Sequence, residues 1–218
     1  MAKERKIDWM KITASLALAI LIFASGLYLG SLITKSKVND ILNMEQEARL
    51  ELETMAVEGL LLEENPCLNP ALLSGKLNDL GVKLTYLEAQ YKKNDPRILE
   101  LKKPYTLLEV RHYLSMKRMI EECSYNYTLI LFFYSNTPEN IGESEKQGFV
   151  LDYLGQKFDN IKIYSFDSDL DLDIITLLKQ INSITIAPST VIDEKVYAGY
   201  HDKEELEKIL RKKFPNVK

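Results

Sequence analysis

The sequence predicts a C-terminal α/β domain, preceded by an all-α helical stalk and one transmembrane helix. Three observations carry this prediction. Residues 12–34 contain no charged side chain, and residues 37–123 are poor in glycine and repeat apolar residues at helical spacing. Residues 125–214 alternate short β-branched or aromatic runs with helical patterns, which is typical of strands joined by helices.

The uncharged run is the predicted membrane span. It is longer than the about 20 apolar residues that cross a bilayer. Basic residues are denser before the run than after it. The positive-inside rule therefore leaves residues 1–11 in the cytoplasm and the C-terminal bulk outside. A cleaved signal peptide is the alternative, but the run is long for one and lacks a small-x-small cleavage pattern near its end. We favour an uncleaved anchor.

Small residues form a stripe along this span. Gly26 and Gly30 have the GxxxG spacing, and Ser15 and Ala19 extend it. Such a stripe lets two helices approach closely, so a homodimer through the span and the stalk is one hypothesis. The other is a single lipid-facing helix that merely contains small residues.

The stalk, residues 37–123, is predicted to break where Asn or Asp precedes proline, at residues 65–66, 69–70 and 95–96. The first pair ends a helix, and the other two start helices with an N-cap and a proline at the first helical position. Pro104 is expected to kink or restart the third helix. The second helix has an a/d seam that can form a coiled coil or, as we favour, pack within the chain: Leu73, Leu77, Leu80, Leu84, Leu87 and Tyr91.

The C-terminal domain, residues 125–214, is predicted to follow the order β-α-β-α-β-β-α. Helical crossovers make the first three strands parallel, and a turn at residues 193–195 adds an antiparallel edge. Asp202 is the expected N-cap of the last helix. The expected strands are residues 127–134, 161–166, 185–192 and 196–200, and the expected helices end near residues 158, 181 and 213.

Three segments give this domain a family resemblance. They are residues 131–135, leading into a loop and helix; residues 186–193, around Pro188; and residues 199–206, which close the domain. In this order they resemble the thioredoxin-like fold. The resemblance covers residues 125–214 only.

The redox motif of that family is absent. Thioredoxins carry Cys-x-x-Cys after the first core strand, at a helix N-terminus that lowers the thiol pKa. The matching stretch here, residues 135–141, holds no cysteine. The hydroxyls of Ser135 and Thr137 cannot cycle through a disulfide. The sequence thus offers no catalytic residue, which favours a non-enzymatic function.

The resemblance does imply a peptide-binding surface. In the family, the residue before a cis-proline offers its main chain to an extended peptide. Here that implies Ala187 and Pro188, beside Asn136 and Thr137 of the former active-site loop. The alternative is that Pro188 only maintains the shape of the domain.

Cys67 and Cys123 flank the second and third predicted helices. If these helices form an antiparallel hairpin, both cysteines lie at its same end, and an extracytoplasmic location permits a disulfide. Two unpaired thiols are the alternative. Cys123 precedes the first strand, so the strand's length, over about 20 Å, separates it from the loop that follows.

The remaining sequence features give weaker functional signals. The alternating acids at 167–173 lack the glycine and glutamate of a calcium loop, and we expect neither a metal nor a cofactor. The net charge of -4 and pI of about 5.4 disfavour nucleic acid as a partner. Asn126 begins a glycosylation tripeptide, which burial of the strand can block.

The sequence therefore predicts a membrane-anchored, extracytoplasmic binding or scaffolding module. Its partner would be another envelope protein or an extended peptide. Two alternatives stay open. One is an accessory of a disulfide-forming system that exchanges Cys67 and Cys123, and the other is a structural spacer that oligomerises.

Overall fold

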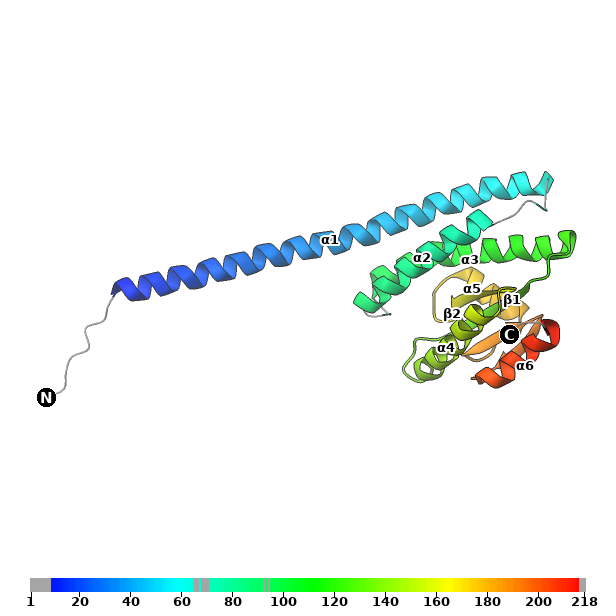
Figure 1. The fold of residues 1–218 in the computed structure, drawn as a ribbon. Helices are drawn as coiled ribbons and strands as arrows, with labels where there is room; N and C mark the ends of the chain where they lie inside the picture. The colour runs from blue at the N-terminus through cyan, green and yellow to red at the C-terminus, as the bar shows by residue number, and fades with distance from the viewer. Residues whose placement is uncertain (1–8, 65–66, 68–70, 92, 94, 216–218) are drawn as a thin grey trace. The chain divides into compact units, whose positions relative to one another are not determined.

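A computed structural model of the chain describes residues 9–64, 67, 71–91, 93 and 95–215 (Figure 1). The chain divides into two units, Met1–Asn43 and Met44–Lys218. The predicted breaks at residues 65–66 and 69–70 lie outside the described residues.

The first unit contains the beginning of helix α1 (Trp9–Glu64). Its segment Thr13–Lys35 is long and apolar enough to cross a membrane, with a mean hydropathy of 2.3 and no buried residues. The helix is not interrupted between the apolar segment and the predicted stalk. Residues 35–37 are Lys-Ser-Lys, and none of these removes a backbone donor as proline would.

In the second unit, α2 (Ala71–Gln90) and α3 (Pro96–Cys123) pack against each other. Asp95 is the N-cap of α3, as expected, and its carboxylate accepts a hydrogen bond from the Arg97 N–H at 3.0 Å. The helix does not restart at Pro104, so that alternative was wrong. Proline costs an interior helix a hydrogen bond, and burial of Leu101 and Leu108 on the neighbouring turns retains the helix.

The seam of α2 is used inside the chain. Leu80, Leu84 and Leu87 are buried, and Leu77 packs against a core cluster that includes Val110 of α3. This is the packing that the sequence favoured over a coiled coil with a second copy.

A disulfide joins Cys67 to Cys123, with the sulfur atoms 2.04 Å apart. It links the segment before α2 to the last residue of α3. The two residues are 56 apart in the sequence. Closing a loop of that length stabilises the folded chain by about 4 kcal/mol in the chain-entropy model.

The sheet has four strands in the order β2-β1-β3-β4, so β1 and β3 are central. β1 (Thr128–Tyr134) is almost continuously buried, as its run of aromatic and β-branched residues predicted. The other strands are β2 (Ile161–Asp167), β3 (Ser189–Ile192) and β4 (Lys195–Ala198), and the helices between and after them are α4 (Ile141–Lys157), α5 (Asp173–Ile181) and α6 (Lys203–Lys213).

The direction of β3 corrects the sequence prediction. β1 and β2 are parallel, but β3 runs antiparallel to β1. The reason is the length of α5. Its nine residues rise roughly 13 Å, whereas the seven residues of β2 span roughly 23 Å, so α5 does not return the chain to the starting end of the sheet. The segment 185–188, predicted as strand, instead leads into β3.

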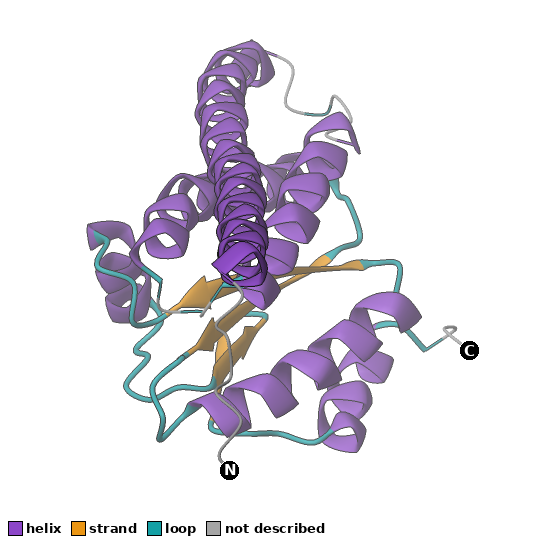
Figure 2. Ribbon diagram, turned by 90° about the vertical axis from the view of Figure 1, so that its left-hand side faces the viewer, coloured by secondary structure: helices purple, strands orange, loops and turns teal. Residues whose placement is uncertain are grey.

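Helices cover both faces of the sheet (Figure 2). The even-numbered residues Ile130 and Phe132 pack with α4 and α6. The odd-numbered Leu131 and Phe133 pack with α3 and α5. Asp202 is the N-cap of α6, as predicted, and accepts from the Glu205 N–H at 2.9 Å.

Candidate functional site

The loop that follows β1 lies at the end of the sheet where a thioredoxin carries its cysteines. Ser135 and Asn136 are buried there, and β2 ends beside them at Asp167. The Asp169 Oδ2 atom accepts from the Ser135 hydroxyl at 2.9 Å and from the Asn136 N–H at 2.8 Å. The side-chain amide of Asn136 donates to Asp167 Oδ2 at 2.8 Å. Two aspartates thus fix the conformation of this loop.

Lys102 reaches this cluster from α3. Its Nζ atom lies 2.8 Å from Asp167 Oδ2 and 2.8 Å from Glu88 Oε1 of α2. The side chains of Lys102 and Asp167 are each 3% exposed. Burial lowers the pKa of Lys102, but the two carboxylates outweigh it and raise that pKa overall. One ammonium group therefore connects α2, α3 and β2.

The start of α4 completes the loop. The Ser135 N–H donates to Ser144 Oγ at 3.1 Å, and the Asn140 side-chain amide donates to Thr137 Oγ1 at 3.1 Å. Thr137 and Asn140 are three residues apart at the helix start, the spacing of the two cysteines in a Cys-x-x-Cys. Neither side chain can form a thiolate, so these two residues cannot perform the thiol chemistry of a Cys-x-x-Cys.

Ala187 and Pro188 lie at the same end of the sheet. Ser189 pairs with Phe133, so the register places the two preceding residues beside the end of β1. The Ala187–Pro188 peptide bond is cis. Pro188 is buried and Ala187 half-buried, while Ile186 is 54% exposed.

The structure therefore brings together the four residues that the resemblance implied for peptide binding, but they are not equally available. Asn136 is buried, and its side-chain amide is bonded to Asp167. The Thr137 hydroxyl lies 3.0 Å from Ser135 Oγ as well as accepting from Asn140. Ala187 and its exposed neighbour Ile186 are the accessible part of this surface.

The remaining predicted residues lie at the opposite end of β1. Cys123 ends α3 just before the strand, and Cys67 is bonded to it. Asn126 is exposed in the segment before β1, while Thr128 of the same tripeptide is fully buried. Within the described residues, no group of three or more His, Cys, Asp or Glu side chains is placed to hold a metal ion.

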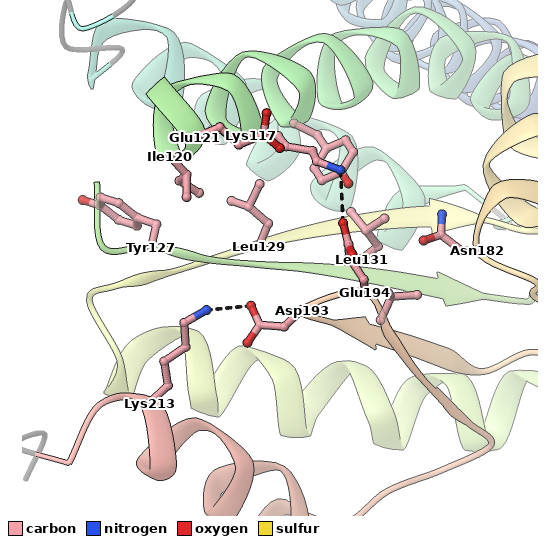
Figure 3. Close-up of a pocket in the computed structure, with 12 residues that line it drawn as sticks. Lys117, Ile120, Glu121, Tyr127, Leu129, Leu131, Asn182, Asp193, Glu194 and Lys213 are labelled. Atoms are coloured by element: carbon pink, nitrogen blue, oxygen red, sulfur yellow. Dashed lines mark hydrogen bonds and ion pairs between the residues drawn. The ribbon is translucent and has the colours of Figure 1, made fainter. Parts of the chain in front are cut away.

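A small hollow lies at this opposite end (Figure 3). Its volume is about 300 Å³, and its walls include Leu129 and Ile120. Two ion pairs hold the turn between β3 and β4 above it: Lys213 with Asp193 at 2.6 Å, and Lys117 with Glu194 at 3.4 Å. Four of the charged side chains that line the hollow thus pair with one another.

Glu109 is a buried acid in the middle of α3. Its Oε1 atom accepts from the Ser165 main-chain N–H of β2 at 3.1 Å, and within the described residues its Oε2 atom has no hydrogen-bond partner. Burial raises the pKa of Glu109 to about 8. The carboxyl group is therefore protonated at neutral pH.

His112, one turn further along α3, is buried as a neutral ring. Its Nδ1 atom lies 2.7 Å from the Tyr164 hydroxyl. Burial, with the Lys162 charge, lowers the pKa of His112 to about 4. The two groups have opposite effects on how stability depends on pH.

The topology around β1 decides the fold. Helices cover both faces of a mixed sheet in the order β2-β1-β3-β4, and a cis-proline precedes β3. The region after residue 125 has a thioredoxin-like fold. No protein-family model and no curated protein matches the chain.

Solved structures similar to this chain include two thioredoxins and a malarial protein. The chloroplastic thioredoxin z is 16% identical over 46% of this chain and 90% of its own, with a TM-score of 0.35. The germline-specific thioredoxin Deadhead of Drosophila melanogaster is 16% identical over 46% and 92%, with a TM-score of 0.34. The malarial protein is 16% identical over 40% and 97%, with a TM-score of 0.32.

The buried charges were not predicted from the sequence. Lys102 and Glu109 belong to no motif, Asp167 was noted only among the alternating acids at 167–173, and the partners of all three lie far away in the sequence. One signal was present: Glu109 interrupts the apolar run 107–110, and Lys102 follows Leu101 on the buried side of α3. A charge in such a position needs a buried partner.

Replacing Lys102 with Met is expected to lower the free energy of unfolding by roughly 3–5 kcal/mol, because the buried charge of Asp167 and the partly buried charge of Glu88 then lose their counter-ion. Urea unfolding of the full chain in detergent micelles, followed by circular dichroism, measures this. Lys103→Met is the matched control. Lys103 pairs with Glu100, which is 68% exposed, so its loss should cost under about 1 kcal/mol. Equal losses from the two variants would contradict the buried ion cluster.

Glu109 should make the protein less stable as the pH rises from 6.5 to 8.5. Its pKa is higher in the folded chain than in the unfolded one, so its stabilising effect is complete below the unfolded value and is lost as the pH rises through about 8. His112, whose pKa is lowered, contributes stability that is complete above its unfolded value of about 6.5. Of these two groups, Glu109 is the one whose contribution falls across this window, and we expect a loss of about 2 kcal/mol.

Glu109→Gln isolates the effect, since the amide keeps an acceptor for Ser165 but does not titrate. Unfolding free energies measured at several pH values should decline for the natural chain and stay level for the variant. The same decline in both would show that Glu109 is ionised in the folded state.

Proposed function

We propose that this chain is a membrane-anchored, extracytoplasmic module that binds or scaffolds another protein and has no thiol-disulfide activity of its own. This proposal rests mainly on the hydrogen bonding of the loop after β1. Its polar groups are bonded to the buried Asp167 and to Asp169, in the place where a thioredoxin presents its cysteines.

The position of the two cysteines supports the same proposal. They are bonded to each other at the far end of β1, about 20 Å of strand from the loop. Redox chemistry at the loop would need a thiol at a helix N-terminus. The chain has two cysteines, and neither is there.

The apolar segment Thr13–Lys35 supports the anchor. With Lys3, Arg5, Lys6 and Lys11 preceding it, the positive-inside rule orients the second unit outward. Gly26 and Gly30 remain a possible contact for a second copy within the membrane. The partner in this proposal is another envelope protein or an extended peptide.

The binding surface proposed for this function is the end of the sheet around Ala187. Ile186 is exposed there. The segment 185–188 bends into β3 and belongs to no strand, and we propose that its main chain pairs with an incoming peptide.

A photo-reactive side chain at Ile186 should crosslink to a partner in living cells. Benzoyl-phenylalanine at this position is expected to give a discrete product of higher mass in the membrane fraction. Leu114 of α3 is the matched control, because it is 55% exposed against 54% for Ile186 but lies on a different face. No product at Ile186, or the same product at Leu114, would argue against a binding surface at this end. A product containing only this chain would favour the oligomerising spacer.

Thiol trapping on intact cells tests the location and the absence of exchange together. A membrane-impermeant, mass-adding alkylator should label Cys67 and Cys123 only after reduction, since a disulfide outside the membrane is protected but accessible. Labelling without reduction, or mixed disulfides that vanish on Cys→Ser change, would favour the thiol-exchange accessory. No labelling even after reduction would contradict the proposed orientation.

A further inference from the structure

The sheet has an open edge at β2. In the order β2-β1-β3-β4, no strand among the described residues pairs with its outer side. The Ser168 N–H donates to the Tyr134 carbonyl oxygen, so even-numbered positions of this strand face β1. Because successive residues of a strand alternate, the main-chain groups of Ile163 and Ser165 point away from the sheet. An edge of this kind is a template for another strand.

Glu109 closes one end of this edge. Its Oε1 atom accepts a hydrogen bond from the outward-facing Ser165 N–H at 3.1 Å. The N–H and carbonyl groups of Ile163, two residues earlier, lie beyond this contact. The open length of β2 is therefore the half that precedes Ser165.

A groove runs beside this half of the strand. It has a volume of about 770 Å³, within the range of ligand sites, and α2, α3, α4 and β2 supply its walls. On α2, Val82 and Tyr86 line the groove and are each 63% exposed. They lie one helical turn apart and present apolar surface to a ligand in the groove.

The charge around the groove is net negative. The carboxylates of Glu88, Glu145 and Asp152 line it with one basic residue, Lys93. Lys93 pairs with Glu145 at 2.8 Å and Glu88 pairs with Lys102 at 2.8 Å, so Asp152 supplies the net negative charge of the rim. An occupant that carries positive charge matches this rim.

We propose that the groove binds an extended, basic segment of a partner polypeptide, which adds to the open edge of β2 at Ile163 as a fifth strand. The main-chain groups of Ile163 recognise the peptide backbone, Val82 and Tyr86 contact its apolar side chains, and the acidic rim attracts its basic ones. Glu109 ends the path of the strand. This site is separate from the surface around Ala187 and does not depend on it.

The test uses the full chain in dodecyl maltoside micelles and a fluorescein-labelled heptapeptide of alternating lysine and valine. Fluorescence anisotropy, corrected with protein-free micelles, should show saturable binding. The same peptide with N-methyl groups on the main-chain nitrogens of one edge should bind at least about tenfold more weakly, because it keeps the charge but cannot pair as a strand. A glutamate–valine peptide of the same length should bind at least about tenfold more weakly too.

Two matched variants locate the site. Val82→Arg should weaken binding at least about tenfold by adding bulk and positive charge to the groove. Val57→Arg makes the same change on α1 at a residue of 60% exposure and should leave binding within about twofold. Hydrogen exchange should show new protection over β2 in the bound state.

Several results would overturn the proposal. They are no saturable binding below about 1 mM, equal binding of the N-methylated peptide, or an equal effect of the two arginine variants. Protection over residues 186–190 in place of β2 would put the peptide at the Ala187 surface, which overturns the groove but supports the proposed function.

Discussion

The contact of Lys102 with Asp167 and Glu88 is the constraint on which the second unit depends. A buried ammonium group requires a counter-ion within hydrogen-bond distance, and here it has two, from different elements. The requirement fixes α3 beside the end of β2 and fixes α2 beside α3. Apolar packing alone, with Leu80, Leu84 and Leu87 on the seam, would tolerate sliding of one helix along the other. The ion cluster sets one position.

The same cluster determines what the loop after β1 can do. Asp167 serves Lys102 and the Asn136 amide through one oxygen, and Asp169 holds Ser135 and the Asn136 main chain. These hydrogen bonds give the polar groups of the loop a structural role.

Much of the fold followed from local patterns. The run from Thr128 to Tyr134 predicted a buried central strand, and Asp95 and Asp202 predicted the starts of α3 and α6. These succeed because burial on both faces and helix capping depend on neighbours in the sequence. The predicted direction of β3 was wrong, because that direction depends on the length of α5 relative to the sheet. The site was half predicted: the end of the sheet with Ala187 was expected, but Lys102 and Glu109 were not.

The sequence by itself determined the apolar segment, the absence of cysteine after β1 and the order of strands and helices. Composition and short-range spacing are sufficient for each of these. Only the tertiary structure decided which charges are buried together, that Cys67 is joined to Cys123, and that β2 is left as an open edge next to a groove. Those features arise from residues far apart in the chain, whose meeting depends on how helices pack across the sheet, and no local pattern records that packing.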